Sequence, residues 1–359
     1  MSYALCVTKF LFPMPITSYI IPAIIAFFLS AIFTWLVLKL AIKFNIVDRP
    51  DAKRKFHSGP IPLLGGAAIF TAFFLSLFLF HQNLVIGILT YRTWLWFFAG
   101  ACFLIFGGIL DDKFNLKPGQ QIIWPILAII CVLLGQIGIG KVSNPLGGFL
   151  YFSSWASILF TVIWLLVMMY TTKLLDGLDG LVTGISGIGG FIIFLFTVSA
   201  KYYQPDIAFV AIVFAAACLG FLIFNWHPAK IFLGEGGSLL LGYILGVLAI
   251  ISGGKIAIAL LVLGLPLLDF VWTILRRLFA GKNPFRTSDR AHLHYRLLDL
   301  GIGTRQTVLI FYAFSLFFGL SALFLQSLGK LFAVSIIFLI MVMLIVSFNF
   351  WEKNNAKKI

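Results

Sequence analysis

The chain has 359 residues, of which 61% are hydrophobic and 11% are charged, and its 26 lysines and arginines against 12 acids give a formal net charge of +14. A soluble domain carries about twice this share of charged residues, so the composition excludes an ordinary soluble enzyme. In a chain this apolar, the basic excess indicates a cytoplasmic membrane face and an anionic substrate rather than nucleic acid.

Apolar runs of about the length that crosses a membrane recur from one end of the chain to the other, which is typical of a polytopic helical membrane protein. They predict an all-α transmembrane bundle that forms one integral-membrane domain over residues 1–359. About eleven spans are expected, beginning near Ile16, Pro62, Trp94, Ile122, Trp155, Val182, Ile207, Ser238, Ile256, Val308 and Leu331. The first run lacks the basic start and cleavage site of a signal peptide, so we interpret it as a retained span.

The basic residues predict the orientation of these spans. When the loop after the first span is placed in the cytoplasm, 19 of the 26 basic residues fall on the cytoplasmic side, and Lys39 lies near the inner end of the first span. The opposite side keeps only Lys9, Arg92, Lys141, Lys201, Lys255 and Lys330. This asymmetry predicts an outside N-terminus and a cytoplasmic C-terminus.

The acidic residues sort to the same face, which the charge rule does not require. Asp206 is the only acid placed outside, whereas ordinary loop solvation would spread acids over both sides. Carboxylates from three separate loops are therefore expected to form one joint site at cytoplasmic span ends. They are Asp111, Asp112, Asp176, Asp179 and Glu235.

Two acidic motifs carry most of this signal. GGILDDKFNLKPGQQ (Gly107–Gln121) places two adjacent aspartates at the end of a span. Adjacent carboxylates repel unless a cation lies beside them, so the pair suits Mg²⁺ arriving with substrate phosphates, or it caps a loop. KLLDGLDGLVTG (Lys173–Gly184) places two aspartates three residues apart, which on a helix gives them one shared face.

A third motif, FNWHPAKIFLGEGGSLLLG (Phe224–Gly242), sets Glu235 between two glycines. Glycines let the backbone approach a phosphate, and the amides at the following helix start favour an anion. The other interpretation is a tight turn between two spans, with Asn225, His227 and Pro228 as turn formers.

Two basic stretches contain histidines. DRAHLHYRLLDLG (Asp289–Gly301) sets His292 and His294 beside arginines, which suits a pyrophosphate or lipid phosphate better than zinc, because no thiol or third histidine completes a zinc set. Cytoplasmic charge without chemistry is the alternative. FHSGPIPLLGG (Phe56–Gly66), with Lys55 before it, has the same two interpretations.

Together, five stretches resemble the polyprenyl-phosphate N-acetylhexosamine-1-phosphate transferases (glycosyltransferase family 4) in order and spacing, and the chain looks like the branch that acts on undecaprenyl phosphate and GlcNAc. The stretches are DRPDAKRKFHSGPIPLLGG, GGILDDKFNLKP, LLDGLDGLVTG, FNWHPAKIFLGEGGS and HLHYRLLDLG.

The resemblance implies a reaction: a UDP-N-acetylhexosamine gives its sugar 1-phosphate, most simply GlcNAc-1-phosphate, to undecaprenyl phosphate, and UMP is released. This would be the first membrane step of cell-envelope polysaccharide synthesis, at the cytoplasmic face of the cell (inner) membrane. Besides these substrates, membrane lipids and a second copy in a homodimer are the implied partners, and nucleic acid is not.

The resemblance also implies residue roles. It assigns catalysis to Asp111, Asp112, Asp179, His292 and His294. It assigns donor binding to Lys55, His57, Lys173, Asp176, Gly177, Leu178, Asn225, Phe232 and Arg290. It assigns Mg²⁺, with Mn²⁺ as an alternative, to Asp111, Asp112 and Glu235.

Three positions depart from the family pattern. The family usually has Asn at Lys173 and Asp at Glu235, and often His at Tyr295. A protonated lysine cannot bind Mg²⁺, and its cation competes for the same phosphate oxygens. One hypothesis is that Lys173 pairs with Glu235 or contacts the donor pyrophosphate, so that the protein needs Mg²⁺ less; the other is that it turns to solvent beside an ordinary metal site.

Other classes fit less well. A polytopic transporter or flippase of a polyprenyl-linked sugar would use ionisable residues near mid-membrane. Here the acids lie at span ends except Asp269, which we expect to pair with Arg276 or Arg277 about two turns along the same helix. A CDP-alcohol phosphatidyltransferase or an aspartate-rich prenyltransferase would need acidic positions that this chain lacks.

Overall fold

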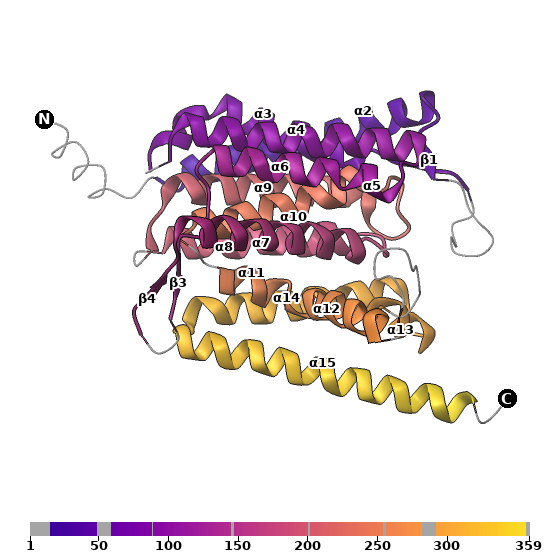
Figure 1. The fold of residues 1–359 in the computed structure, drawn as a ribbon. Helices are drawn as coiled ribbons and strands as arrows, with labels where there is room; N and C mark the ends of the chain where they lie inside the picture. The colour runs from indigo at the N-terminus through magenta and orange to yellow at the C-terminus, as the bar shows by residue number, and fades with distance from the viewer. Residues whose placement is uncertain are drawn as a thin grey trace, which may run out of the picture.

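The computed structural model is built almost entirely from helices (Figure 1). It describes residues 15–48, 59–87, 89–144, 147–199, 202–253, 256–279, 281 and 292–356. Three residues expected to bind the donor, Lys55, His57 and Arg290, lie outside the described residues.

The helices follow one another along most of the described chain, as the hydropathy predicts. In chain order they are α2 (Thr17–Lys43), α3 (Gly65–Leu79), the 3₁₀ helix η1 (His81–Val85), α4 (Tyr91–Phe114), α5 (Pro118–Gln121), α6 (Ile123–Leu134), α7 (Ser154–Leu175), α8 (Leu181–Val198), α9 (Pro205–Asn225), α10 (Gly234–Ile251), α11 (Ile256–Val262), α12 (Gly264–Phe279), α13 (Leu293–Asp299), α14 (Thr304–Phe324) and α15 (Ser327–Ala356). The strands in the described part form two short antiparallel hairpins, β1 (Val47–Asp48) with β2 (Ile61–Pro62) and β3 (Lys141–Ser143) with β4 (Phe149–Tyr151).

Seven of the described helices are long and apolar enough to cross a membrane: α2, α4, α7, α8, α9, α10 and α14. An eighth candidate is α11 with α12, which together bend by 83°. Shorter apolar helices cover Gly65–Leu79, Pro118–Leu134 and Leu328–Leu344. The chain is therefore a multi-pass membrane protein of mainly helical fold, and the count of eleven spans and the orientation of the termini stay predictions.

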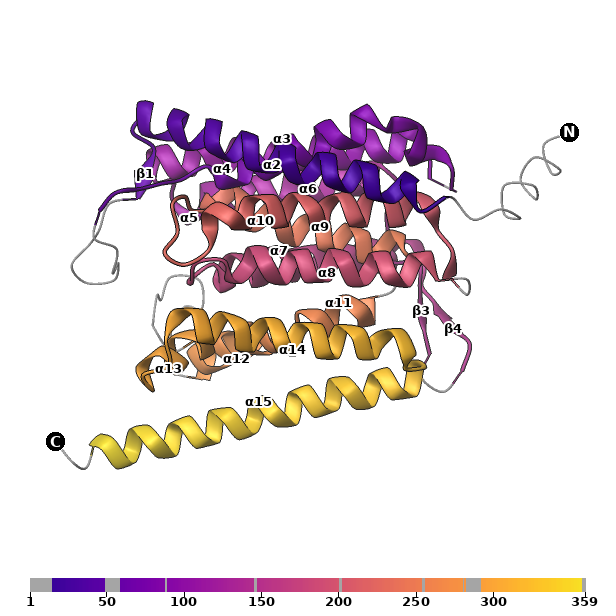
Figure 2. The same ribbon diagram turned by 180° about the vertical axis from the view of Figure 1, so that it is seen from behind.

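The long helices lie side by side in stacked layers, and the view from behind gives the same order (Figures 1 and 2). Helices α2, α3, α4 and α6 form one side of the stack, α7 to α10 the middle, and α11, α12, α14 and α15 the other side. Of the most apolar window of α10, 89% is buried, against 22% for α2. A helix that is apolar all round belongs inside, so α10 is the central helix and α2 presents its apolar side chains to lipid.

Glycines let α3 and α4 pack closely against the central helix α10. A Cβ on Gly108 of α4 would overlap the backbone of Gly236 in α10, and a Cβ on Gly66 of α3 would overlap Gly237. Small residues let helix backbones touch in a membrane. This contact fixes the aspartate-bearing end of α4 against the start of α10.

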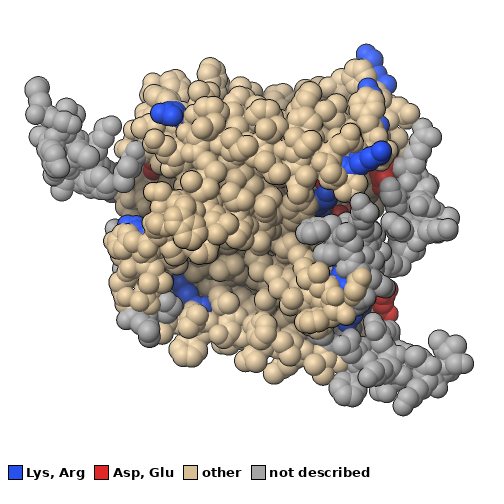
Figure 3. Space-filling view, viewed as in Figure 1, with Lys and Arg blue, Asp and Glu red and all other residues tan. Residues whose placement is uncertain are grey.

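Charged side chains gather at one end of the bundle. In Figure 3 most of the visible acidic atoms, with several basic ones, lie at the end where Figure 1 places β1, α5 and α13, and the broad flank of the bundle is uncharged. The candidate site lies at this end.

Candidate active site

The first carboxylate of the site, Asp111, is held by the turn that follows α4. Its Oδ1 accepts hydrogen bonds from the backbone N–H of Leu116 at 2.8 Å and from Nε2 of Gln121 at 3.0 Å. Asn115 adopts a positive φ of 51°, which ends α4 and folds the chain back toward the aspartate. Asp111 is therefore fixed in orientation. Gln121 is not predicted as a site residue from the sequence, because a glutamine alone carries no chemical signature.

The second carboxylate, Asp112, lies at the start of the central helix. Its Oδ1 accepts a hydrogen bond from the backbone N–H of Glu235 at 3.0 Å. Free N–H groups and the helix dipole at a helix N-terminus favour an anion, so this hydrogen bond stabilises the Asp112 carboxylate. The close packing of Gly108 on Gly236 brings the two segments within reach.

Lys173, at the end of α7, connects these segments. Its ammonium forms an ion pair with Oε1 of Glu235 and also donates to Oε1 of Gln121 at 3.3 Å. The two paired side chains are 23% and 19% exposed, so the lysine does not extend into solvent. Of the two hypotheses for Lys173, the pairing with Glu235 is the one that the structure contains.

These contacts form a continuous chain that we call the polar ring. It runs through Asp111, Gln121, Lys173, Glu235 and Asp112. Its members come from α4, α5, α7 and α10, so four helices meet at it. Because Asp111 and Asp112 are neighbours in sequence, the contacts close into a ring, and Lys173 is its one cation.

The residues of the ring do not fit the three-carboxylate metal centre that the resemblance implies. Among the described residues, no three acidic, histidine or cysteine side chains converge on one point. Oε1 of Glu235 is paired with the Lys173 ammonium, whose positive charge opposes a metal ion there. Both oxygens of Asp111 already accept hydrogen bonds from Gln121, and Oδ1 accepts another from Leu116. We derive no step through a metal ion.

The segment between α7 and α8 is a turn. Asp176 and Asp179 were expected to share a helix face, and this expectation is wrong: α7 ends at Leu175 and α8 begins at Leu181. Gly180 has a φ of 78°, which places it in the left-handed region that favours glycine and interrupts the helix.

The two aspartates of this turn have different surroundings. Desolvation by nearby protein, followed by the negative charges of neighbouring carboxylates with Glu235 first, raises the pKa of Asp176. The residue is nevertheless exposed to solvent, so the charges of the neighbouring carboxylates are the cause that best accounts for this direction. Oδ2 of Asp179, in contrast, lies 2.7 Å from Nδ1 of His227 and accepts from the N–H of Ala229 at 3.1 Å.

Asn225, which is expected to bind the donor, is buried, and its side chain forms hydrogen bonds to other residues of the protein. Its Oδ1 accepts from the N–H of Gly180 at 3.1 Å and from the hydroxyl of Thr183 at 3.0 Å, and its Nδ2 donates to the carbonyl of Ile231 at 3.0 Å. The side chain thus holds the start of α8 against the end of α9.

The histidine motif is fastened to α12. Both oxygens of Asp269 are used: Oδ2 lies 2.9 Å from Nδ1 of His292, and Oδ1 accepts from the N–H of Leu293 at 3.1 Å. Sequence spacing along α12 instead predicts Arg276 or Arg277 as the partner of Asp269, and nothing local indicates His292. The carboxylate fixes which ring nitrogen of His292 carries hydrogen and orients the first residues of α13.

His294 is the most enclosed member of the motif. It is 1% exposed, its ring stacks on His292 with centroids 5.7 Å apart, and its Nε2 has no hydrogen-bond partner among the described residues. Burial lowers the pKa of His294 to about 4, against a smaller upward effect of the Asp269 charge. The imidazole is therefore neutral at pH 7 and offers one nitrogen for a hydrogen bond rather than a positive charge.

Gly177 lies directly against this motif. A Cβ on Gly177 would overlap Nε2 of His294 and the hydroxyl of Tyr295, whose Oη donates to the carbonyl of Gly177 at 3.5 Å. The aspartate turn and the histidine motif, which are more than a hundred residues apart in sequence, therefore form one wall of the site.

The two remaining predicted donor-binding residues act through backbone and packing. The N–H of Gly65 donates to the carbonyl of Phe232 at 2.9 Å, and the N–H of Phe232 donates to the carbonyl of Pro62 at 2.9 Å. Leu178 is half-buried and packs against the core. Both lie at the same end of the bundle as the polar ring.

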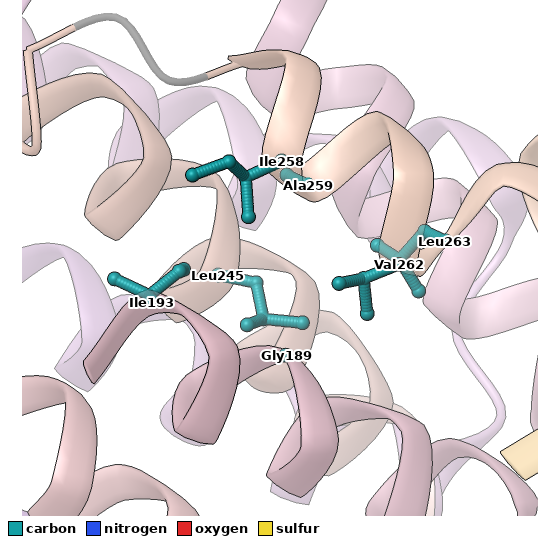
Figure 4. A pocket seen from close by; sticks show the side chains of 7 residues that line it. All are labelled: Gly189, Ile193, Leu245, Ile258, Ala259, Val262 and Leu263. Atoms are coloured by element: carbon teal, nitrogen blue, oxygen red, sulfur yellow. The ribbon is translucent and has the colours of Figure 1, made fainter. Parts of the chain in front are cut away.

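A narrow apolar pocket inside the bundle is separate from this site (Figure 4). It lies between α8, α10 and α11, and the side chains around it are Gly189, Ile193, Leu245, Ile258, Ala259, Val262 and Leu263. None of the predicted site residues contributes to it, and its lining offers no group for polar chemistry.

Known proteins with similar sequences point to one family. The sequence profile described as glycosyl transferase family 4 matches residues 94–253. A probable undecaprenyl-phosphate N-acetylglucosaminyl 1-phosphate transferase of Bacillus subtilis is 32% identical over 329 residues, covering 89% of each chain. An undecaprenyl-phosphate alpha-N-acetylglucosaminyl 1-phosphate transferase of Thermotoga maritima is 33% identical, covering 84% of this chain and 88% of the relative. A decaprenyl-phosphate N-acetylglucosaminephosphotransferase of Mycobacterium tuberculosis is 31% identical, covering 77% and 74%.

Proposed function

The chain belongs to glycosyl transferase family 4 and is a transferase, and we propose that it moves GlcNAc-1-phosphate from UDP-GlcNAc to undecaprenyl phosphate and releases UMP. The names of the relatives support a polyprenyl-phosphate acceptor and a sugar-phosphate group. The observation that carries the proposal is the polar ring, in which four helix ends converge on fixed carboxylates and one cation.

The chemistry requires little covalent help from the protein. An oxygen of the lipid phosphate attacks the phosphorus that bears the sugar, a new P–O bond forms, and the P–O bond to the uridylyl phosphate breaks with its electron pair going to UMP. A phosphate monoester has its second pKa near 6, so most of it is already dianionic at pH 7 and no proton has to be removed. Asp111, held by Gln121 and Leu116, then positions the reacting groups rather than acting as a base.

The uridine end is assigned to the wall formed by Gly177, His294 and Tyr295. Gly177 lets the histidine motif pack directly against the aspartate turn, and His294, enclosed behind this contact, is kept uncharged. Phosphate charge is met elsewhere, at the ring, where Lys173 and the start of α10 lie. This division suits a ligand with a neutral nucleoside at one end and a pyrophosphate at the other.

The site is proposed to face the cytoplasm of the cell membrane, where nucleotide sugars are made. The 19 basic residues on that side, against six outside, support this orientation. The acceptor would enter from the lipid around the bundle. A transporter is the weaker alternative, because the ring carboxylates lie at helix ends and not at mid-membrane.

The proposal is tested with the purified full-length protein, undecaprenyl phosphate and UDP-GlcNAc labelled in the sugar and at the β-phosphate. UMP is expected to appear in step with both labels in the lipid phase, and Asp112→Asn is expected to lower the rate by about a hundredfold or more. A parallel reaction with UDP-GalNAc tests the choice of sugar. Release of UDP, with lipid that carries only the sugar label, contradicts the proposal.

A further inference from the structure

Lys173 lies between two of the segments that build the site. Its ammonium contacts the Glu235 carboxylate and the Gln121 amide oxygen. Both contacts come from segments other than α7, so the lysine is held from two sides and its long side chain has already lost much of its freedom.

The lysine contacts leave one hydrogen for a ligand. An ammonium group has three N–H donors, and Glu235 and Gln121 account for two of them. The third can be donated to a phosphate oxygen, and the single positive charge is shared between that oxygen and Glu235. A divalent ion at the same Oε1 of Glu235 would lie beside the ammonium and meet its positive charge.

We propose that Lys173 is the built-in cation of this site, taking the place of a metal ion between Glu235 and the pyrophosphate of the donor. The inference rests on the proposed function, because it assumes a donor with a pyrophosphate. Lys173 and Glu235 act as a pair: the longer carboxylate reaches the ammonium and holds it, and the ammonium offsets the carboxylate charge that would otherwise repel the donor.

The polar ring also connects Lys173, which is proposed to contact the donor, with Asp111, which is proposed to position the reacting groups. Gln121 accepts from Lys173 with Oε1 and donates from Nε2 to Asp111, so the position of the cation and that of the aspartate are set by one side chain. When the P–O bond to UMP breaks, negative charge grows on the leaving uridylyl phosphate. A fixed ammonium stabilises that charge without having to be recruited from solution.

The test exchanges the pair for the family residues. Wild type, Lys173→Asn, Glu235→Asp and the double variant are purified, and the affinity for UDP-GlcNAc is measured from the ligand-dependent rise in melting temperature, in EDTA and in Mg²⁺. Transfer rates are measured under the same two conditions. Lys117→Met, which removes an exposed lysine outside the ring, is the matched control and is expected to behave like wild type.

Wild type is expected to bind the donor in EDTA within about tenfold of its affinity in Mg²⁺, and the double variant is expected to need Mg²⁺, with a loss of about a hundredfold in EDTA. The losses of the two single variants should sum to more than the loss of the double variant, because each single variant leaves one group of the pair without its partner.

Two results overturn the inference: donor binding by wild type that requires Mg²⁺ as strictly as the double variant, or energies for the two substitutions that simply add. If Lys173→Asn does not fold, wild type and Lys173→Arg, which keeps the positive charge, are compared instead. Both are then expected to bind the donor in EDTA, and a strict Mg²⁺ requirement in wild type overturns the inference. Failure of the proposed function is distinct, because then no lipid-linked product forms under either condition.

Discussion

The neutral state of His294 gives the sharpest physical prediction about the site. Burial holds its pKa near 4, whereas a histidine in the unfolded chain titrates near 6.5. As the pH falls below 6.5, the unfolded state takes up a proton that the folded state refuses, so stability falls with pH. Each pH unit in this window changes stability by about 1.4 kcal/mol. Lowering the pH from 7 to 5 should therefore cost about 2 kcal/mol through this one residue, and the loss should level off near pH 4.

Two measurements check this. The chain has five histidines, so a sample labelled with ¹³C in histidine gives few ring signals, and His294→Gln identifies the signal of interest. That signal is expected to stay at the neutral position from pH 8 to pH 5. The melting temperature of wild type should fall by a few degrees more than that of His294→Gln over the same range. A His294 signal that titrates near 6.5, or an equal loss of stability in both proteins, refutes the reasoning.

Two further predictions concern the wall of the site and the orientation of the chain. Gly177→Ala should lower kcat/KM by about a hundredfold with little change in expression, because the new methyl group displaces His294 and Tyr295. The control Gly140→Ala should keep wild-type activity, because a Cβ there meets nothing within 4 Å. Equal activity of the two variants contradicts this prediction. In a background without Cys6, Cys102, Cys131 and Cys218, a cysteine in place of Lys141 should react with an impermeant thiol reagent on intact cells, and one in place of Lys230 should not. Labelling at position 230 from outside reverses the orientation.

Much of the fold is predictable from local sequence. Seven of the eleven expected spans coincide with described helices that are long enough to cross a membrane, because the length and apolarity of a run are local properties that suffice to make a helix in lipid. The run from Ile256 is instead broken into α11 and α12. The order of the acidic and histidine motifs likewise indicates the family, which the similar sequences confirm. The turn at Asp176 was mistaken for a helix, since three-residue spacing alone does not reveal that Gly180 adopts a positive φ.

The contacts that organise the site depend on the tertiary structure. Nothing local links Gln121 to Lys173, Asp269 to His292, or Gly177 to His294, because each pair joins residues between 23 and 117 positions apart. They meet because small residues let α4 and α10 touch and because α13 folds back onto α12. The sequence by itself determined which side chains were available at the span ends. Only helix packing decided that a lysine would lie on Glu235, where the family pattern implies a metal ion, because that contact depends on where α7 and α10 end relative to each other.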